Sequence, residues 1–97
     1  HYDSVNNPGA DDDGSGTVAL LATAKLLSDK VLEHGVRFVA FDEEELGLVG
    51  SAAYVRELAA SGEKSRILGD LQVEMLGYNG RNDGKFHVIS CDRKDSE

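Results

Sequence analysis

The run of three aspartates at 11–13 constrains the fold more than any other feature of this chain. Like charges this close repel each other, and aspartate disfavours regular secondary structure. A compensating feature is therefore needed. The apolar segment that follows at once suggests one, because a helix N-terminus offers free N–H groups and a partial positive charge. A bound cation is the other candidate for the compensating feature. A solvated acidic loop that merely caps a helix stays open as an interpretation.

Composition limits the classes of protein that need be considered. The 97 residues suffice for one domain, with 40% hydrophobic and 29% charged residues, as in soluble globular proteins. The net charge of −8 argues against a nucleic-acid partner, because phosphate binding needs a basic face. A single cysteine, Cys91, excludes an internal disulfide and a metal site built from thiols alone. No apolar run approaches the roughly 20 residues of a membrane span, so none is predicted.

Apolar periodicity predicts two helices. The first covers residues 15–32 and ends near Gly35, and its wide apolar arc predicts that most of it is buried. The second covers about residues 51–60, with Ser51 as a candidate N-cap and a stop at Ser61 and Gly62.

Three runs rich in β-forming residues predict strands at 36–41, 68–75 and 85–90. The first is apolar on both faces, which is typical of a parallel sheet. Alternating strands and helices predict an α/β fold. Ligands of such folds gather at the carboxyl ends of the strands. Five candidate site residues fall at or just after such ends: His1, Asp12, Glu44, Glu45 and Glu74. We expect them to form one site.

Four stretches together carry a family resemblance. They are HYDS at 1–4, PGADDDGSG at 8–16, DEEELGLVGS at 42–51 and DLQVEMLGY at 70–78. In this order and at these spacings they resemble the M28 family of co-catalytic zinc metallopeptidases, which includes bacterial leucyl aminopeptidases. The resemblance implies a three-layer α/β sandwich, with a mostly parallel sheet flanked by helices. It implies that residues 1–97 form a single, incomplete catalytic domain.

The resemblance also implies a role for each matching residue. His1 and Glu74 would be terminal ligands of a first zinc, with Asp3 orienting His1. Asp12 would bridge two zinc ions, and its peptide bond to Asp13 would be cis. Glu45 would be a terminal ligand of the second zinc, and Glu44 the general base that acts on a metal-bridged water.

The chemistry explains these residue types. Two metal ions about 3.5–4 Å apart need a bridging carboxylate, which also offsets their mutual repulsion. Imidazole nitrogen and carboxylate oxygen both suit zinc. A neighbouring carboxylate can take a proton from the attacking water and later give it to the leaving amine.

The pattern breaks at one point, because the family uses a further histidine ligand well downstream. His87 is the only histidine after the acidic clusters, and we interpret it as an ordinary strand residue. We therefore expect this chain to resemble the metal-binding middle of such an enzyme. The isolated chain should then have one tighter and one weaker divalent site, and little peptidase activity.

Several functions stay open on the sequence. The leading hypothesis is a zinc-dependent exopeptidase of aminopeptidase type, acting on peptides. The alternatives are a metal-binding fragment without turnover, another M28 activity such as carboxypeptidase or glutaminyl cyclase, and copper chelation by the amine and imidazole of His1. Exposed sheet edges would allow self-association. The compartment is not readable from the residues, although the resemblance favours a secreted or periplasmic protein.

Overall fold

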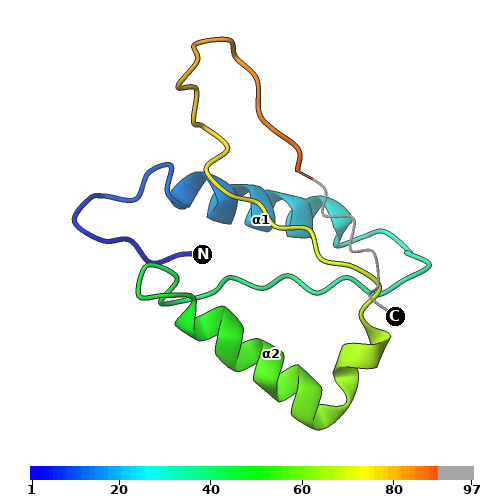
Figure 1. Ribbon diagram of the computed structural model, residues 1–97. Helices are drawn as coiled ribbons and strands as arrows, with labels where there is room; N and C mark the ends of the chain where they lie inside the picture. The colour runs from blue at the N-terminus through cyan, green and yellow to red at the C-terminus, as the bar shows by residue number, and fades with distance from the viewer. Residues whose placement is uncertain (90–97) are drawn as a thin grey trace.

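Two α-helices and one short 3-10 helix make up the regular structure of residues 1–89, the part of the chain that the computed structural model describes. Helix α1 is Gly14–Leu27, helix α2 is Val49–Ser61, and the 3-10 helix η1 is Glu63–Arg66. In Figure 1 the extended segment 36–41 passes between α1 and α2. The N-terminus meets the end of this segment, where Tyr2 N donates to Phe41 O at 3.0 Å.

Helix α1 begins where the acidic run ends. The side chain of Asp13 is the N-cap and accepts a hydrogen bond from Gly16 N at 3.0 Å, which satisfies one of the free N–H groups of the first turn. The helix ends at Leu27, and Ser28 N donates back to Lys25 O. The predicted helix at 15–32 is therefore confirmed in place, but it ends five residues earlier than expected.

Helix α2 begins without a side-chain cap. Leu48 is the N-cap residue, with a left-handed backbone at φ 62°, and the hydroxyl of Ser51 donates to Leu48 O at 3.2 Å. The predicted N-cap at Ser51 is therefore wrong. The predicted stop is confirmed, because Gly62 has a φ of 76°, a conformation that glycine adopts at low cost.

The predicted sheet is wrong for the residues that the structure describes. Residues 1–89 contain no β-strand, so a sandwich of helices on a parallel sheet is not formed by them. A strand needs a neighbour whose N–H and C=O groups face its own. Residues 36–41 and 68–75 have no such neighbour within this range, and Met75 at the end of the second run has a left-handed backbone with a φ of 40°. Residues 85–89 are also without strand structure, and residue 90 lies outside the described part.

The hydrophobic core is small. Leu58 in α2 is the one large hydrophobic side chain that is buried among residues 1–89, at 6% exposure. Helix α1 buries only Gly16, and Val18 and Leu21 are exposed, so the prediction of a mostly buried first helix is also wrong. Its wide apolar arc has no packed layer to face among the described residues.

Aromatic and charged contacts join segment 36–41 to α2 and η1. The rings of Phe41 and Tyr54 lie 5.6 Å apart. Arg37 donates to the hydroxyl of Tyr54 and to the carboxylate of Glu63, each at 2.7 Å. These contacts hold the extended segment against α2 and so place the acidic turn that follows it. Among the described residues, no helix has the length and apolar character needed to cross a membrane.

Candidate metal centre

The imidazole of His1 lies at the centre of the acidic residues, and its side chain is only 3% exposed. Its Nδ1 lies 3.1 Å from Asp3 O and 3.2 Å from Asp3 Oδ1. Both atoms are acceptors, so Nδ1 carries the hydrogen and donates it to Asp3. The backbone is fixed as well, because the hydroxyl of Thr17 donates to His1 O at 2.8 Å. The ring is therefore held with Nε2 directed away from Asp3.

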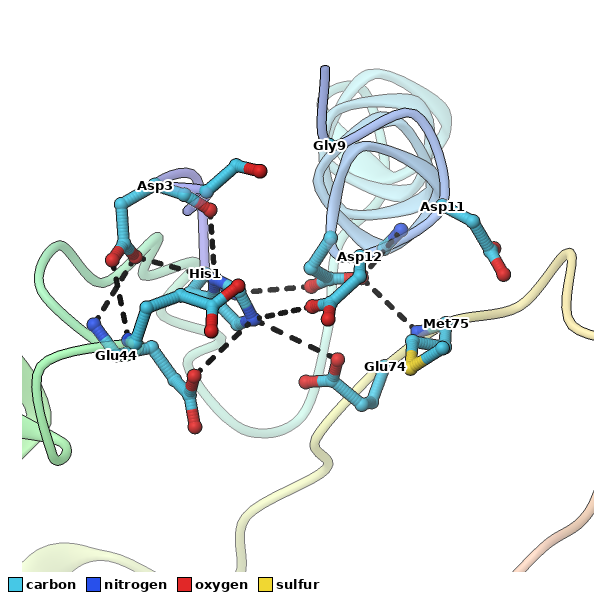
Figure 2. A network of polar contacts seen from close by, with 12 residues as sticks. His1, Asp3, Gly9, Asp11, Asp12, Glu44, Glu74 and Met75 are labelled. Carbon is cyan, nitrogen blue, oxygen red and sulfur yellow. Dashed lines mark hydrogen bonds and ion pairs between the residues drawn. The ribbon is translucent and has the colours of Figure 1, made fainter. Parts of the chain in front are cut away.

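Three carboxylates face this Nε2 (Figure 2). The distances are 3.1 Å to Asp12 Oδ1, 3.7 Å to Glu44 Oε2 and 3.7 Å to Glu74 Oε1. A nitrogen lone pair that faces several anionic oxygens is unfavourable unless a proton or a cation lies between them. The arrangement therefore demands positive charge at one point, and this fits a metal ion.

Asp3 joins His1 to the second acidic turn. Its Oδ1 accepts from Glu44 N at 3.1 Å, and its Oδ2 accepts from Glu45 N at 3.2 Å. The same carboxylate therefore contacts the ring of His1 and two consecutive amides. This explains how segments 41 residues apart in the chain bring their side chains to one place.

The pKa values report how crowded the carboxylates are. Loss of hydration raises the pKa of Glu74, and the charges of Asp13, Asp12 and Glu44 add to this effect. The pKa of Glu45 is also raised, first by loss of hydration and then by the charges of Asp12, Glu44 and Asp3. A cation would relieve this repulsion.

One donor group has the spacing of a metal site. His1, Asp12 and Glu74 each offer a ligand atom, and these atoms lie within 4.8 Å of one another. Imidazole with two carboxylates is a donor set that zinc accepts. Three of the predicted site residues are thus brought together. Glu44 lies beside them, and Glu45 is near enough to Asp12 for its pKa to respond, but it is not a member of this donor group.

His87 lies elsewhere. The orange segment of Figure 1, which holds the last of the described residues, forms a loop that stands away from both helices. The side chain of His87 is exposed. It is not part of the donor group formed by His1, Asp12 and Glu74. The interpretation of His87 as an ordinary residue is consistent with this position, although the strand predicted around it is absent from residues 85–89.

Sequence reasoning did not assign a role to Asp13, which is the most buried polar residue described, at 2% exposure. Its Oδ1 accepts from Gly16 N and from Met75 N, and its Oδ2 accepts from the backbone nitrogen of His1. The peptide bond between Asp12 and Asp13 is cis, as the resemblance implied. An aspartate three residues before an amide of a predicted first helical turn is a recognisable N-cap signal. The contacts of Asp13 with His1 and Met75 join distant positions, and no pattern in the neighbouring sequence predicts them.

Comparison with known proteins supports the family resemblance seen in the sequence motifs. Residues 1–95 match the sequence profile of "Peptidase family M28". The chain is 39% identical over 93 residues to "Aminopeptidase YwaD" of Bacillus subtilis (strain 168), which covers 95% of the chain and 20% of that relative. It is 45% identical over 78 residues to an "Aminopeptidase" of Pseudomonas aeruginosa (strain UCBPP-PA14), covering 79% of the chain and 14% of the relative.

A third relative carries a different name. The chain is 44% identical over 80 residues to "Leupeptin-inactivating enzyme 1" of Streptomyces exfoliatus, covering 79% of the chain and 18% of the relative. The chain therefore spans between 14% and 20% of the length of these three relatives. No solved structure matches it.

Proposed function

We propose that this chain, which belongs to peptidase family M28, carries the metal-binding centre of an aminopeptidase. The observation that carries the proposal is the environment of His1 Nε2, which faces three carboxylates at 3.1 to 3.7 Å. Relatives named as aminopeptidases from Bacillus subtilis and Pseudomonas aeruginosa support the choice of reaction.

The residues present fit one zinc ion and supply two of the ligands that a second would need. His1 and Glu74 would hold the first ion, and Glu45 the second, with Asp12 shared between them. When bound, zinc acts as a Lewis acid that polarises the scissile carbonyl and lowers the pKa of a water molecule. The shared carboxylate suits Asp12, because it lies 3.1 Å from His1 Nε2 and its charge also acts on Glu45.

Glu44 is proposed as the general base. Its carboxylate lies 3.7 Å from His1 Nε2, beside the donor group but outside it. Its backbone N–H is fixed by Asp3 Oδ1, which limits where the side chain can reach. From this position the Glu44 carboxylate takes a proton from the attacking water and returns it to the leaving amine. Glu45, whose amide binds the other oxygen of Asp3, is left to bind metal.

The division of labour between the two glutamates is tested by Glu44→Gln in the complete protein. Glutamine keeps the shape and polarity of the side chain but cannot take the proton. We expect hydrolysis of an aminoacyl-p-nitroanilide to fall by about 10²–10⁴-fold, with zinc content unchanged by elemental analysis. The matched control is Glu43→Gln, an exposed position in the same turn that should keep its activity.

Three results would contradict the proposal. Loss of zinc in Glu44→Gln would make Glu44 a ligand. Zinc binding without hydrolysis by the unaltered complete protein would favour a metal-binding role alone. Cleavage of substrates with a blocked amino terminus, but not of free ones, would exclude an aminopeptidase.

A further inference from the structure

Three consecutive backbone amides are held by side chains at the start of α1. The pairs are Met75 N with Asp13 Oδ1 at 3.1 Å, Leu76 N with Ser15 Oγ at 2.9 Å, and Gly77 N with Asp11 Oδ1 at 2.7 Å. These three amides follow Glu74 directly in the chain. These amides lie at a turn, because Met75 has a φ of 40° and Tyr78 N donates to Met75 O at 3.1 Å. Among residues 1–89 no strand pairs with them, and side chains at the start of α1 supply their acceptors.

The accepting side chains are themselves tied together. The hydroxyl of Ser15 lies 2.9 Å from Asp11 O and 2.8 Å from Asp11 Oδ1, so it donates to Asp11 while it accepts from Leu76 N. Asp13 is fixed by its cap contact with Gly16 N. The acceptors therefore have little freedom of their own.

The backbone comes unusually close to Asp11 at Gly77. A Cβ atom at position 77 would lie 2.7 Å from Asp11 Oδ1, nearer than such atoms approach each other. A glycine is what lets the amide reach the carboxylate here. Figure 2 shows the side chain of Asp11 pointing away from His1, on the far side of Asp12. Asp11 is therefore engaged with the backbone and is not directed at the metal centre.

We propose that Asp11, Asp13 and Ser15 are positioning residues that fix Glu74 at the metal centre, and we call these three side chains the amide clamp. The inference rests on the proposed function, because it assumes that Glu74 binds metal. Glu74 precedes the clamped amides, and its Oε1 lies 3.7 Å from His1 Nε2. Without the clamp the turn at 75–77 would shift, and Glu74 would no longer share one point with His1 and Asp12.

Ser15→Ala is the main test, because it changes no charge. It removes both the acceptor for Leu76 N and the donor to Asp11. We expect zinc affinity of the full chain at the tighter site to fall by about 10- to 100-fold, the effect usual for residues that support metal ligands. Competition with a chromophoric zinc chelator measures this. Ser15→Thr keeps the hydroxyl and should restore the affinity, and Ser28→Ala, at the other end of α1, is the matched control.

Two substitutions of Asp11 separate charge from hydrogen bonding. Asp11→Asn and Asp11→Ala lose the same negative charge, but only Asn retains an oxygen that can accept from Gly77 N and Ser15. We expect Asp11→Ala to bind zinc about tenfold more weakly than Asp11→Asn. With Co²⁺ in place of zinc, Ser15→Ala and Asp11→Ala should also alter the visible absorption bands of the site, which a general loss of stability would not do.

The outcomes distinguish the two proposals. Zinc binding that is insensitive to His1→Ala and Glu74→Ala would overturn the proposed metal centre. Zinc binding that needs His1 and Glu74 but is equal in the unaltered chain and in Ser15→Ala would overturn the amide clamp alone. Circular dichroism reports helix content. If Ser15→Ala lowers the helix content, the test is the zinc affinity of Asp11→Asn and Asp11→Ala compared at equal helix content. Equal zinc affinity of these two variants would overturn the amide clamp.

Discussion

Asp3 illustrates how one residue serves two purposes at the site. Its carboxylate accepts from the amides of Glu44 and Glu45 and from the ring of His1. The residue therefore orients the imidazole and at the same time brings the second acidic turn to it. The backbone oxygen of Asp3 also contacts Nδ1, so part of the orientation survives without the side chain.

This double role predicts the effect of Asp3→Ala. We expect zinc affinity at the site that contains His1 to fall by about 10- to 100-fold, because the ring loses an acceptor and two amides lose their partner. Isothermal titration with zinc, or competition with a chelator at high affinity, measures the change. Asp70→Ala removes the same charge at an exposed position and is the control. Equal loss in both variants would mean that only net charge matters.

For single residues, the sequence predicted which side chains of the motifs would come together. His1, Asp12 and Glu74 were predicted to converge, and the structure brings one donor atom of each together. Their roles as ligands stay predictions. The contacts of Asp11 and Asp13 with residues 75–77 were not foreseen, because they join positions more than 60 residues apart, and no local pattern encodes such pairs.

Helix ends were predicted unevenly. The stop of α2 at Gly62 was predicted, whereas α1 ends five residues earlier than expected and its cap at Asp13 was not assigned, although such a cap follows a known rule. The start of α2 follows none, since Leu48 has a left-handed backbone without a side-chain cap. The strand predictions were wrong for another reason. An apolar run rich in β-forming residues forms a strand only when a partner segment supplies hydrogen bonds.

Gly50, near the start of α2, gives a prediction of unusual sign. Alanine usually stabilises a helix relative to glycine by about 0.8–1.0 kcal/mol. Here a Cβ would collide with the backbone oxygen of Asp42, which already accepts a hydrogen bond from Gly50 N. Backbone cannot move aside as a side chain can, and overpacking costs about 1–3 kcal/mol. We therefore expect Gly50→Ala to lower the midpoint of urea unfolding.

The control for this prediction is Gly69→Ala. Nothing lies within 4 Å of a Cβ built at position 69, so the midpoint should stay the same or rise. A higher midpoint for Gly50→Ala would show that the turn at Asp42 can adjust. Because this turn leads to Glu44, the same variant tests how rigidly the acidic turn is held.

The contact between Arg37 and Glu63 should make the docking of segment 36–41 depend on pH. The hydrogen bond and charge of Arg37 lower the pKa of Glu63 below its usual value of 4.5. A depressed carboxylate pKa stabilises the folded state above the unfolded-state pKa, and this contribution is lost as pH falls through the folded-state pKa. The Arg37→Met variant should therefore have a lower unfolding midpoint than the unaltered chain at pH 7.

The difference in midpoint should shrink as pH falls through the lowered folded-state pKa of Glu63, where the carboxylate becomes protonated. It should also shrink in high salt, because both groups are exposed and screened. The bond from Arg37 to the hydroxyl of Tyr54 persists at low pH, so part of the difference should remain. Arg56→Met, at an exposed position on α2, is the control. A difference that does not change with pH would assign the whole effect to Tyr54.

At the scale of the whole molecule, exposed apolar surface and negative charge oppose each other. Leu58 is the only buried large hydrophobic residue described, whereas Val31, Leu68, Leu71 and Val88 are all strongly exposed. Exposed apolar groups in such number favour association, because their burial removes them from water. The net charge of −8 at neutral pH opposes association through repulsion between copies.

This balance predicts self-association of the isolated chain that grows as pH falls from 7 towards its isoelectric point of about 4.7, where the net charge approaches zero. Light scattering coupled to gel filtration should show a larger mass at pH 5 than at pH 7, with stronger binding of a hydrophobic dye. Leu68→Gln with Leu71→Gln leaves the charge unchanged and should reduce the mass at both pH values. Repulsion between copies is smallest near pH 5, so association through apolar side chains should be strongest there. Association that weakens towards pH 5, or that is unchanged by the two substitutions, would therefore contradict an apolar origin.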